Sequence, residues 1–141
     1  MSLGNNIAEF VLKMTSVRQT DLGGGQRRLE VDYAGEVSGP VAGNHYGTLA
    51  AVFNENDDPA RPNHFSWTGT TLTESGAIVN ISAWGLSQGT WHKGDSLRLR
   101  SIGRLTSTDS ALAAYNNQMV AFEGEFDPAT GTLKGAGLEW K

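Results

Sequence analysis

Two histidines and two aspartates carry the side chains best suited to acid–base chemistry. His64 begins a predicted strand, His92 lies in a later loop, and Asp57 and Asp58 lie in the polar loop just before His64. A histidine oriented by a carboxylate is a suitable general base near neutral pH. If alternate loops share an end of the fold, these four residues can meet, and they are our candidate catalytic residues. The simpler interpretation is that both histidines are exposed at loop ends.

Other patterns that carry chemistry are missing from the sequence. The histidines do not have the spacing of a metal motif, and we expect no metal. No serine-nucleophile elbow, phosphate-binding loop, zinc-protease or dinucleotide signature occurs, so we expect no cofactor. Gly23, Gly24 and Gly25 do not follow a strand–helix–strand pattern, and they therefore indicate a turn.

The elements that must position these residues are strands. Residues 63–73 and 77–86 are rich in β-branched and aromatic residues and flank Glu74-Ser75-Gly76, a pattern typical of a β-hairpin. Neither run has an apolar period of 3.6 residues. Similar runs predict further strands at 7–17, 28–37, 45–53, 97–106, 118–126 and 132–140.

About eight strands with short connections predict an all-β fold. We favour an antiparallel up-and-down β-barrel over a sandwich, because closure removes edges that apolar strands would otherwise expose. Residues 108–115 could form one short helical turn, capped by Asp109 or Ser110. We expect a single domain over residues 7–141, preceded by a flexible N-terminus at residues 1–6.

Alternation along each strand predicts what lies inside. The more apolar faces place aromatic and aliphatic side chains in the interior, together with small residues: Gly35, Gly47, Ala51, Gly69, Ala83, Gly103 and Gly124. An eight-stranded barrel has room for its own side chains or for one small ligand. The small residues favour a cavity, although glycines also mark bends in a curled sheet. The predicted ligand-binding residues are Tyr33, Phe53, Phe65, Trp67, Ile81, Leu99 and Phe122.

On the outer face, charge patterning predicts pairing. Arg98, Arg100 and Arg104 alternate with apolar residues, and Glu123 and Glu125 occupy the matching face of the next strand. A net charge of −4 argues against nucleic acid as a partner. No apolar run approaches the roughly 20 residues that cross a bilayer, and we see neither cysteine nor a secretory signal, so we expect a cytoplasmic protein.

Three stretches carry a family resemblance. Asp21–Arg28, and Ala34–Pro40 with Gly43, resemble the opening of an uncharacterised bacterial family of small barrels with a streptavidin-like or calycin-like fold. Leu72–Val79 is similar to that family's hairpin, with Ser75-Gly76-Ala77 where the family commonly has Asp-Gly-Ala. The family has no settled activity, so the resemblance implies a fold and no catalytic residue. A weaker resemblance to allene-oxide-cyclase-type barrels implies ligand binding or cyclisation in an apolar cavity.

Three hypotheses for function follow. The first is a barrel that binds a small, mostly apolar or aromatic molecule inside. The second is a cofactor-free isomerase, cyclase or lyase that acts on a small hydrophobic substrate through His64 or His92. The third is a structural or oligomerisation module with no small-molecule site, for which an outward-facing Trp84 would fit a contact between subunits in a homo-oligomer.

Overall fold

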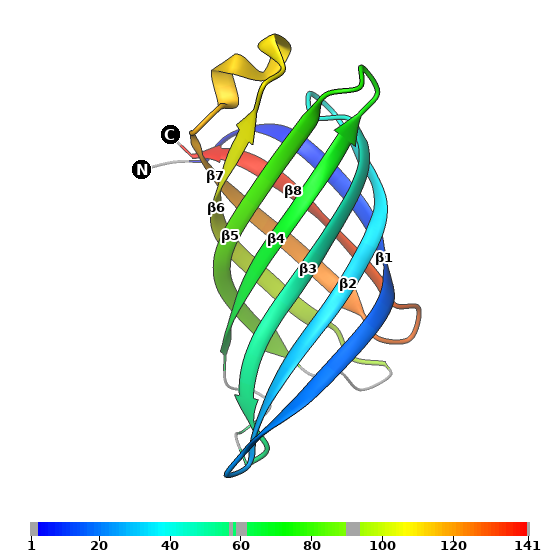
Figure 1. Cartoon of the computed structure of the whole chain (residues 1–141), viewed down its shortest axis with the longest axis vertical. Helices are drawn as coiled ribbons and strands as arrows, with labels where there is room; N and C mark the ends of the chain where they lie inside the picture. The colour runs from blue at the N-terminus through cyan, green and yellow to red at the C-terminus, as the bar shows by residue number, and fades with distance from the viewer. Residues whose placement is uncertain (1–2, 57, 59–61, 90–93, 141) are drawn as a thin grey trace.

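A computed structural model describes residues 3–56, 58, 62–89 and 94–140. Within these residues the chain forms a closed barrel of eight antiparallel strands in the order β1 to β8, as the alternation predicts (Figure 1). The elements are β1 (Leu3–Gly23), β2 (Gln26–Ser38), β3 (Gly43–Asn54), β4 (Asn63–Thr73), β5 (Ile78–Gly89), β6 (Leu97–Ser107), η1 (Ser110–Tyr115), β7 (Met119–Asp127) and β8 (Thr132–Trp140).

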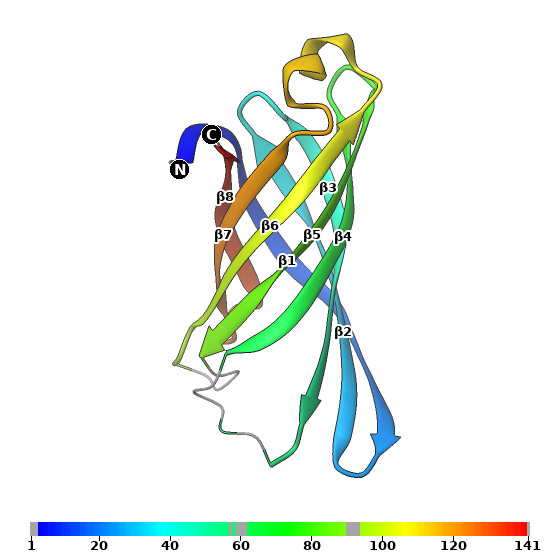
Figure 2. The ribbon, with the colours of Figure 1, turned by 90° about the vertical axis from the view of Figure 1, so that its left-hand side faces the viewer.

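Pairing of the first strand with the last closes the barrel. In this ladder Phe10 lies opposite Gly135, and Leu12 lies opposite Leu133. Leu3 also pairs with β8, so β1 begins earlier than the predicted Ile7 and includes residues 3–6, which were expected to be flexible. At its other end β1 runs on beside β2 to Gly23. This hairpin projects past the barrel wall (Figure 2).

The connections divide between the two ends as an up-and-down barrel requires. β1, β3, β5 and β7 end, and β2, β4, β6 and β8 begin, at one end of the barrel, and the β2–β3, β4–β5 and β6–β7 connections share the other end (Figure 1). The predicted helical turn is a 3₁₀ helix at this second end. The carboxylate of Asp109 accepts a hydrogen bond from the backbone N–H of Ala111 at 2.9 Å, which caps the helix as predicted.

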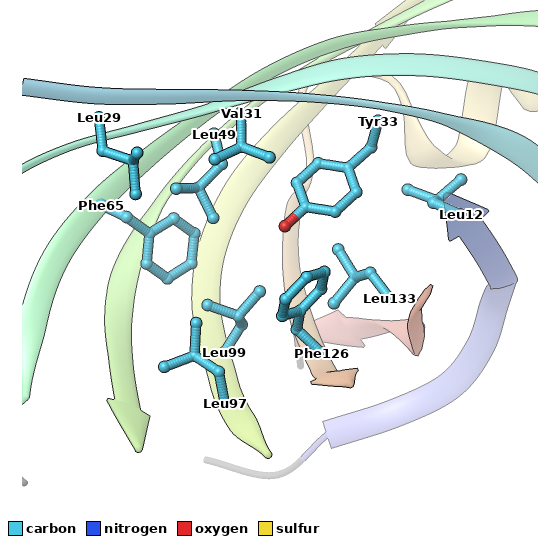
Figure 3. Close-up of a cluster of buried hydrophobic side chains, with 10 residues drawn as sticks. All are labelled: Leu12, Leu29, Val31, Tyr33, Leu49, Phe65, Leu97, Leu99, Phe126 and Leu133. Atoms are coloured by element: carbon cyan, nitrogen blue, oxygen red, sulfur yellow. The ribbon is translucent and has the colours of Figure 1, made fainter. Parts of the chain in front are cut away.

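The buried apolar side chains of the described residues form two clusters. The first cluster spans β1–β4 and β6–β8, and Figure 3 shows its members: Leu12, Leu29, Val31, Tyr33, Leu49, Phe65, Leu97, Leu99, Phe126 and Leu133. The second cluster lies nearer the end that carries η1, and it comprises Ile7, Ala8, Val37, Val41, Val79, Leu105, Leu112 and Val120. Leu112 comes from η1, so the short helix helps to close that end of the barrel.

The outer face carries the predicted charged side chains. Arg98 lies opposite Glu125 and Arg100 opposite Glu123, with 4.0 Å between Nε of Arg100 and Oε1 of Glu123. Both side chains of this second pair are mostly exposed, so the pair adds little stability. Trp84 points outward from β5 and is 63% exposed. Among the described residues, no helix has the length and apolar character to cross a membrane.

Candidate functional site

A cavity of about 70 Å³ lies between the two clusters. Its walls take residues from both of them, such as Leu12 and Phe65 from the first cluster and Ile7 and Leu105 from the second. Between these ends the walls contain Phe10, Trp67, Ile81, Ala83, Ser101, Phe122 and Gly124. The barrel interior is therefore apolar at both ends and hollow between them.

Five of the seven predicted ligand-binding residues line this cavity: Phe65, Trp67, Ile81, Leu99 and Phe122. Tyr33 and Phe53 do not line it. Tyr33 is buried within the first cluster, and Phe53 packs beside the same cluster. The structure thus places most of the predicted set around one space, and their binding of a ligand stays a prediction.

The predicted small residues create less of the hollow than expected. Of the seven, Ala83 and Gly124 line the cavity. At Gly35 and Gly103 a Cβ would collide with the backbone of the neighbouring strand, so these glycines let the curled strands approach each other. They therefore mark close approaches between neighbouring strands.

Three side chains give the cavity a polar wall. His45 on β3 and Thr71 on β4 lie opposite each other in the ladder, and Trp67 projects from β4. The Nδ1 of His45 lies 2.9 Å from the Oγ1 of Thr71, and the Nε1–H of Trp67 donates to the Nε2 of His45 at 3.2 Å. His45 and Thr71 are both buried. We call His45, Trp67 and Thr71 the inner network.

The direction of these hydrogen bonds is fixed by the indole. Trp67 Nε1–H is a donor only, so the Nε2 of His45 must carry the lone pair that accepts it. The proton of the neutral imidazole therefore lies on Nδ1, from where it is donated to Thr71. Burial lowers the pKa of His45 to about 4, which agrees with a neutral ring.

Two glycines make room for this arrangement. Gly47 on β3 and Gly69 on β4 are paired in the ladder, and the rings of His45 and Trp67 lie across them. A Cβ on Gly69 would lie 2.5 Å from the His45 Nε2 and 2.8 Å from the Trp67 Nε1. The rings stack with 5.8 Å between centroids and 15° between planes. The absence of a side chain at Gly47 and Gly69 thus allows the two rings to lie where they do.

Tyr33 adds a second polar feature to the interior. Its ring centroid lies 5.4 Å from that of Trp67 and 5.9 Å from that of Phe126. The hydroxyl points into the first cluster, where it has no hydrogen-bond partner among the described residues (Figure 3). Burial raises the pKa of Tyr33 above its usual range, so the phenol stays protonated and able to donate.

A contrasting polar group lies on the outside of the barrel wall. The carboxylate of Asp32 accepts hydrogen bonds from Ser16 Oγ at 2.6 Å, from Thr48 Oγ1 at 2.7 Å and from Arg18. The hydrogen bond from Arg18 has the largest effect on the pKa of Asp32, and with those from Ser16 and Thr48 it holds this pKa well below its ordinary value. We call Ser16, Arg18, Asp32 and Thr48 the outer network. Asp32 is thus an outer-face residue.

The predicted catalytic residues lie away from the cavity walls or outside the described residues. His64 and Asp58 are exposed, and neither lines the cavity. His92 and Asp57 lie outside the described residues, so the proposed meeting of the two histidines stays a prediction. Among the residues that the structure describes, no group of three or more His, Cys, Asp or Glu side chains is arranged to hold a metal ion.

Sequence reasoning missed His45 and Thr71 as site residues. His45 has the same parity as Gly47 and Leu49 on β3, so its inward orientation was readable from the alternation. Its pairing with Thr71 was not, since that depends on the register between β3 and β4.

Comparisons with known proteins support the fold alone. No protein-family model and no curated protein sequence matches the chain. It is similar in structure to the conserved protein of unknown function RPA1785 from Rhodopseudomonas palustris, with a TM-score of 0.77 and 14% identity over 99% of each chain. It is similarly close to a protein of unknown function from Clostridium acetobutylicum ATCC 824, with a TM-score of 0.77 and 12% identity over 100% of each chain.

Proposed function

We propose that this barrel binds a small, uncharged and mostly apolar molecule in its central cavity. The observation that carries the proposal is the cavity itself, which lies between two apolar clusters and has one polar wall. Pockets for small molecules are typically apolar with a few placed polar groups. Glu123 contributes to the lining, but its side chain is exposed and pairs with Arg100 on the outer face. A charged ligand would therefore be buried without a partner, which is costly.

The size of the cavity limits the ligand to a few heavy atoms. An engineered apolar cavity of about 150 Å³ takes up benzene or xenon, and this one has about half that volume. A larger ligand would require side chains such as Phe10 or Phe122 to change rotamer. A cavity of this size is nevertheless large enough for xenon or a small ketone or alkene.

The inner network favours binding over acid–base catalysis. The lone pair on Nε2 of His45 accepts the Trp67 N–H, so this imidazole has no free lone pair with which to take a proton from a substrate. Its low pKa also makes it a weak base at neutral pH. The isomerase, cyclase or lyase hypothesis therefore depends on His64, near the start of β4, and on His92, which lies outside the described residues.

Xenon binding tests the proposed function. Xenon dissolved under pressure should shift the NMR signals of methyl groups that line the cavity, such as those of Ile81 and Leu99. Ala83→Leu places extra methyl groups in the cavity and should abolish the shifts. Ala50→Leu is the matched control, because Ala50 lies on the outer face of β3. Saturable shifts that persist in Ala83→Leu, or no shifts in the wild type, would refute cavity binding.

The remaining expectations belong to the same proposal. A calycin-like or streptavidin-like kinship, a bacterial source and a cytoplasmic location are proposed from the sequence, and the barrel fold supports the first of them only at the level of architecture.

Self-association through the exposed Trp84 is also proposed. Sedimentation of the wild type and of Trp84→Ser measures it, and a monomer at all concentrations would exclude it.

A further inference from the structure

The hydrogen bonds at the polar wall of the cavity all run in one direction from donor to acceptor. Trp67 donates to His45, and His45 donates to Thr71, since the indole can only donate. The Oγ1 of Thr71 is the last acceptor in this chain of hydrogen bonds. Its own hydroxyl hydrogen has no acceptor among the described residues, although Thr71 is fully buried and lines the cavity. The series therefore ends in a buried donor at the cavity wall.

A buried donor without an acceptor is unfavourable, and a ligand can remove that cost. We propose that Thr71 selects the ligand by donating a hydrogen bond to one uncharged acceptor, a carbonyl or ether oxygen, on an otherwise apolar molecule. This inference rests on the proposed function. A ligand that can only donate would leave the Thr71 hydrogen unpaired, and an alkane would do the same. An anion is disfavoured because the buried neutral imidazole supplies no positive charge.

His45 and Trp67 act in this scheme as positioning residues. Their hydrogen bonds fix the Thr71 Oγ1 as an acceptor toward Nδ1, and this leaves the hydroxyl hydrogen to point elsewhere. Gly47 and Gly69 hold the two rings close to the sheet. Tyr33 is the competing donor, because its hydroxyl also has no partner among the described residues, but Tyr33 does not line the cavity.

A pair of probes with the same shape isolates the acceptor. Acetone and isobutene differ in a carbonyl oxygen against a methylene group. Their dissociation constants would be measured by NMR titration for the wild type, Thr71→Val, Thr71→Ser and Tyr33→Phe. We expect Thr71→Val to weaken acetone relative to isobutene roughly fivefold, Thr71→Ser to restore the wild-type ratio, and Tyr33→Phe to leave it unchanged.

The outcomes separate this inference from the proposed function. An unchanged ratio in Thr71→Val, or a ratio that moves in Tyr33→Phe instead, overturns the assignment to Thr71 while cavity binding stands. Isobutene binding without acetone binding does the same. If neither probe nor xenon binds, both proposals fail.

The wild type also provides a test that does not depend on a folded Thr71→Val variant. Acetone labelled with ¹³C at the carbonyl reports hydrogen bonding through its chemical shift, which moves upfield in an apolar solvent. Bound acetone should keep a shift close to its value in water. An upfield shift like that in a hydrocarbon would show an unbonded carbonyl and overturn the inference.

Discussion

The inner network and the outer network lie on neighbouring strands and differ mainly in the face that they occupy. Asp32 and Thr48 pair between β2 and β3 on the outside, and His45 and Thr71 pair between β3 and β4 on the inside. Inside, burial lowers the pKa of a histidine and keeps it neutral. Outside, hydrogen bonds and Arg18 lower the pKa of an aspartate and keep it charged. The alternation of the strands thus separates neutral from ionic hydrogen bonding across one wall.

We expect a change in the inner network to lower the free energy of unfolding more than a change in the outer network. Gly69→Ala puts a methyl group against His45 Nε2 and Trp67 Nε1, so the rings must move and their hydrogen bond is lost. We expect the free energy of unfolding to fall by about 3 kcal/mol. Urea unfolding measures it. Gly124→Ala is the control, since its Cβ would lie 3.2 Å from Leu133 Cδ1 and 3.3 Å from the Lys134 carbonyl oxygen, less close than the contacts at Gly69, and we expect it to cost less than Gly69→Ala. Equal losses would contradict the role assigned to Gly69.

The next largest effect should come from acid, which protonates His45 of the inner network. The pKa of His45 is about 4 in the folded protein against an ordinary 6.5, so the unfolded chain binds this proton first as pH falls. Stability attributable to the neutral ring is complete above pH 6.5 and is lost progressively down to pH 4, by about 3 kcal/mol.

Two variants check the source of that pH dependence. In His45→Gln the unfolding free energy should vary less between pH 6.5 and 4 than in the wild type. His64→Gln is the control and should retain the wild-type slope, because His64 is exposed. A wild-type slope in His45→Gln would show that other groups cause the loss.

The outer network should respond to salt and contribute less. Asp32→Asn removes the charge that Arg18 contacts, and because the carboxylate is partly exposed we expect a loss of about 1 kcal/mol or less. The pKa of Asp32 is lowered, so its contribution is present above an ordinary aspartate pKa and is lost as pH falls below it. Unfolding in 0.1 M and 1 M NaCl should show the difference between variant and wild type shrinking with salt. A loss that is independent of salt would contradict this view.

The smallest effect should come from an exposed pair outside both networks. Arg100 and Glu123 are 4.0 Å apart with both side chains mostly exposed. Replacing Arg100 by Gln should leave the urea midpoint unchanged within error, because such pairs often contribute nothing measurable. A clear shift of the urea midpoint would mean that charge pairs on the outer face contribute measurably to stability, contrary to this expectation.

The features that depend on local pattern were predictable from the sequence. Strands, connections and the cap at Asp109 follow from alternation and turn residues close together in the chain. The inner network was not predicted, since the contact of His45 with Thr71 depends on strand register. The role of Gly69 was also missed, because a glycine that holds an aromatic ring and one that widens a cavity have the same sequence signature.

Closure of the barrel has a consequence for how the chain acquires its structure. Glu9 on β1 pairs with Ala136 on β8, so the seam between β1 and β8 cannot form until all eight strands have been made. Pairings so distant in sequence are slow to form. Until then one side of β1 offers unpaired backbone groups to any other extended chain, and we expect the nascent protein to be most prone to aggregation in this interval.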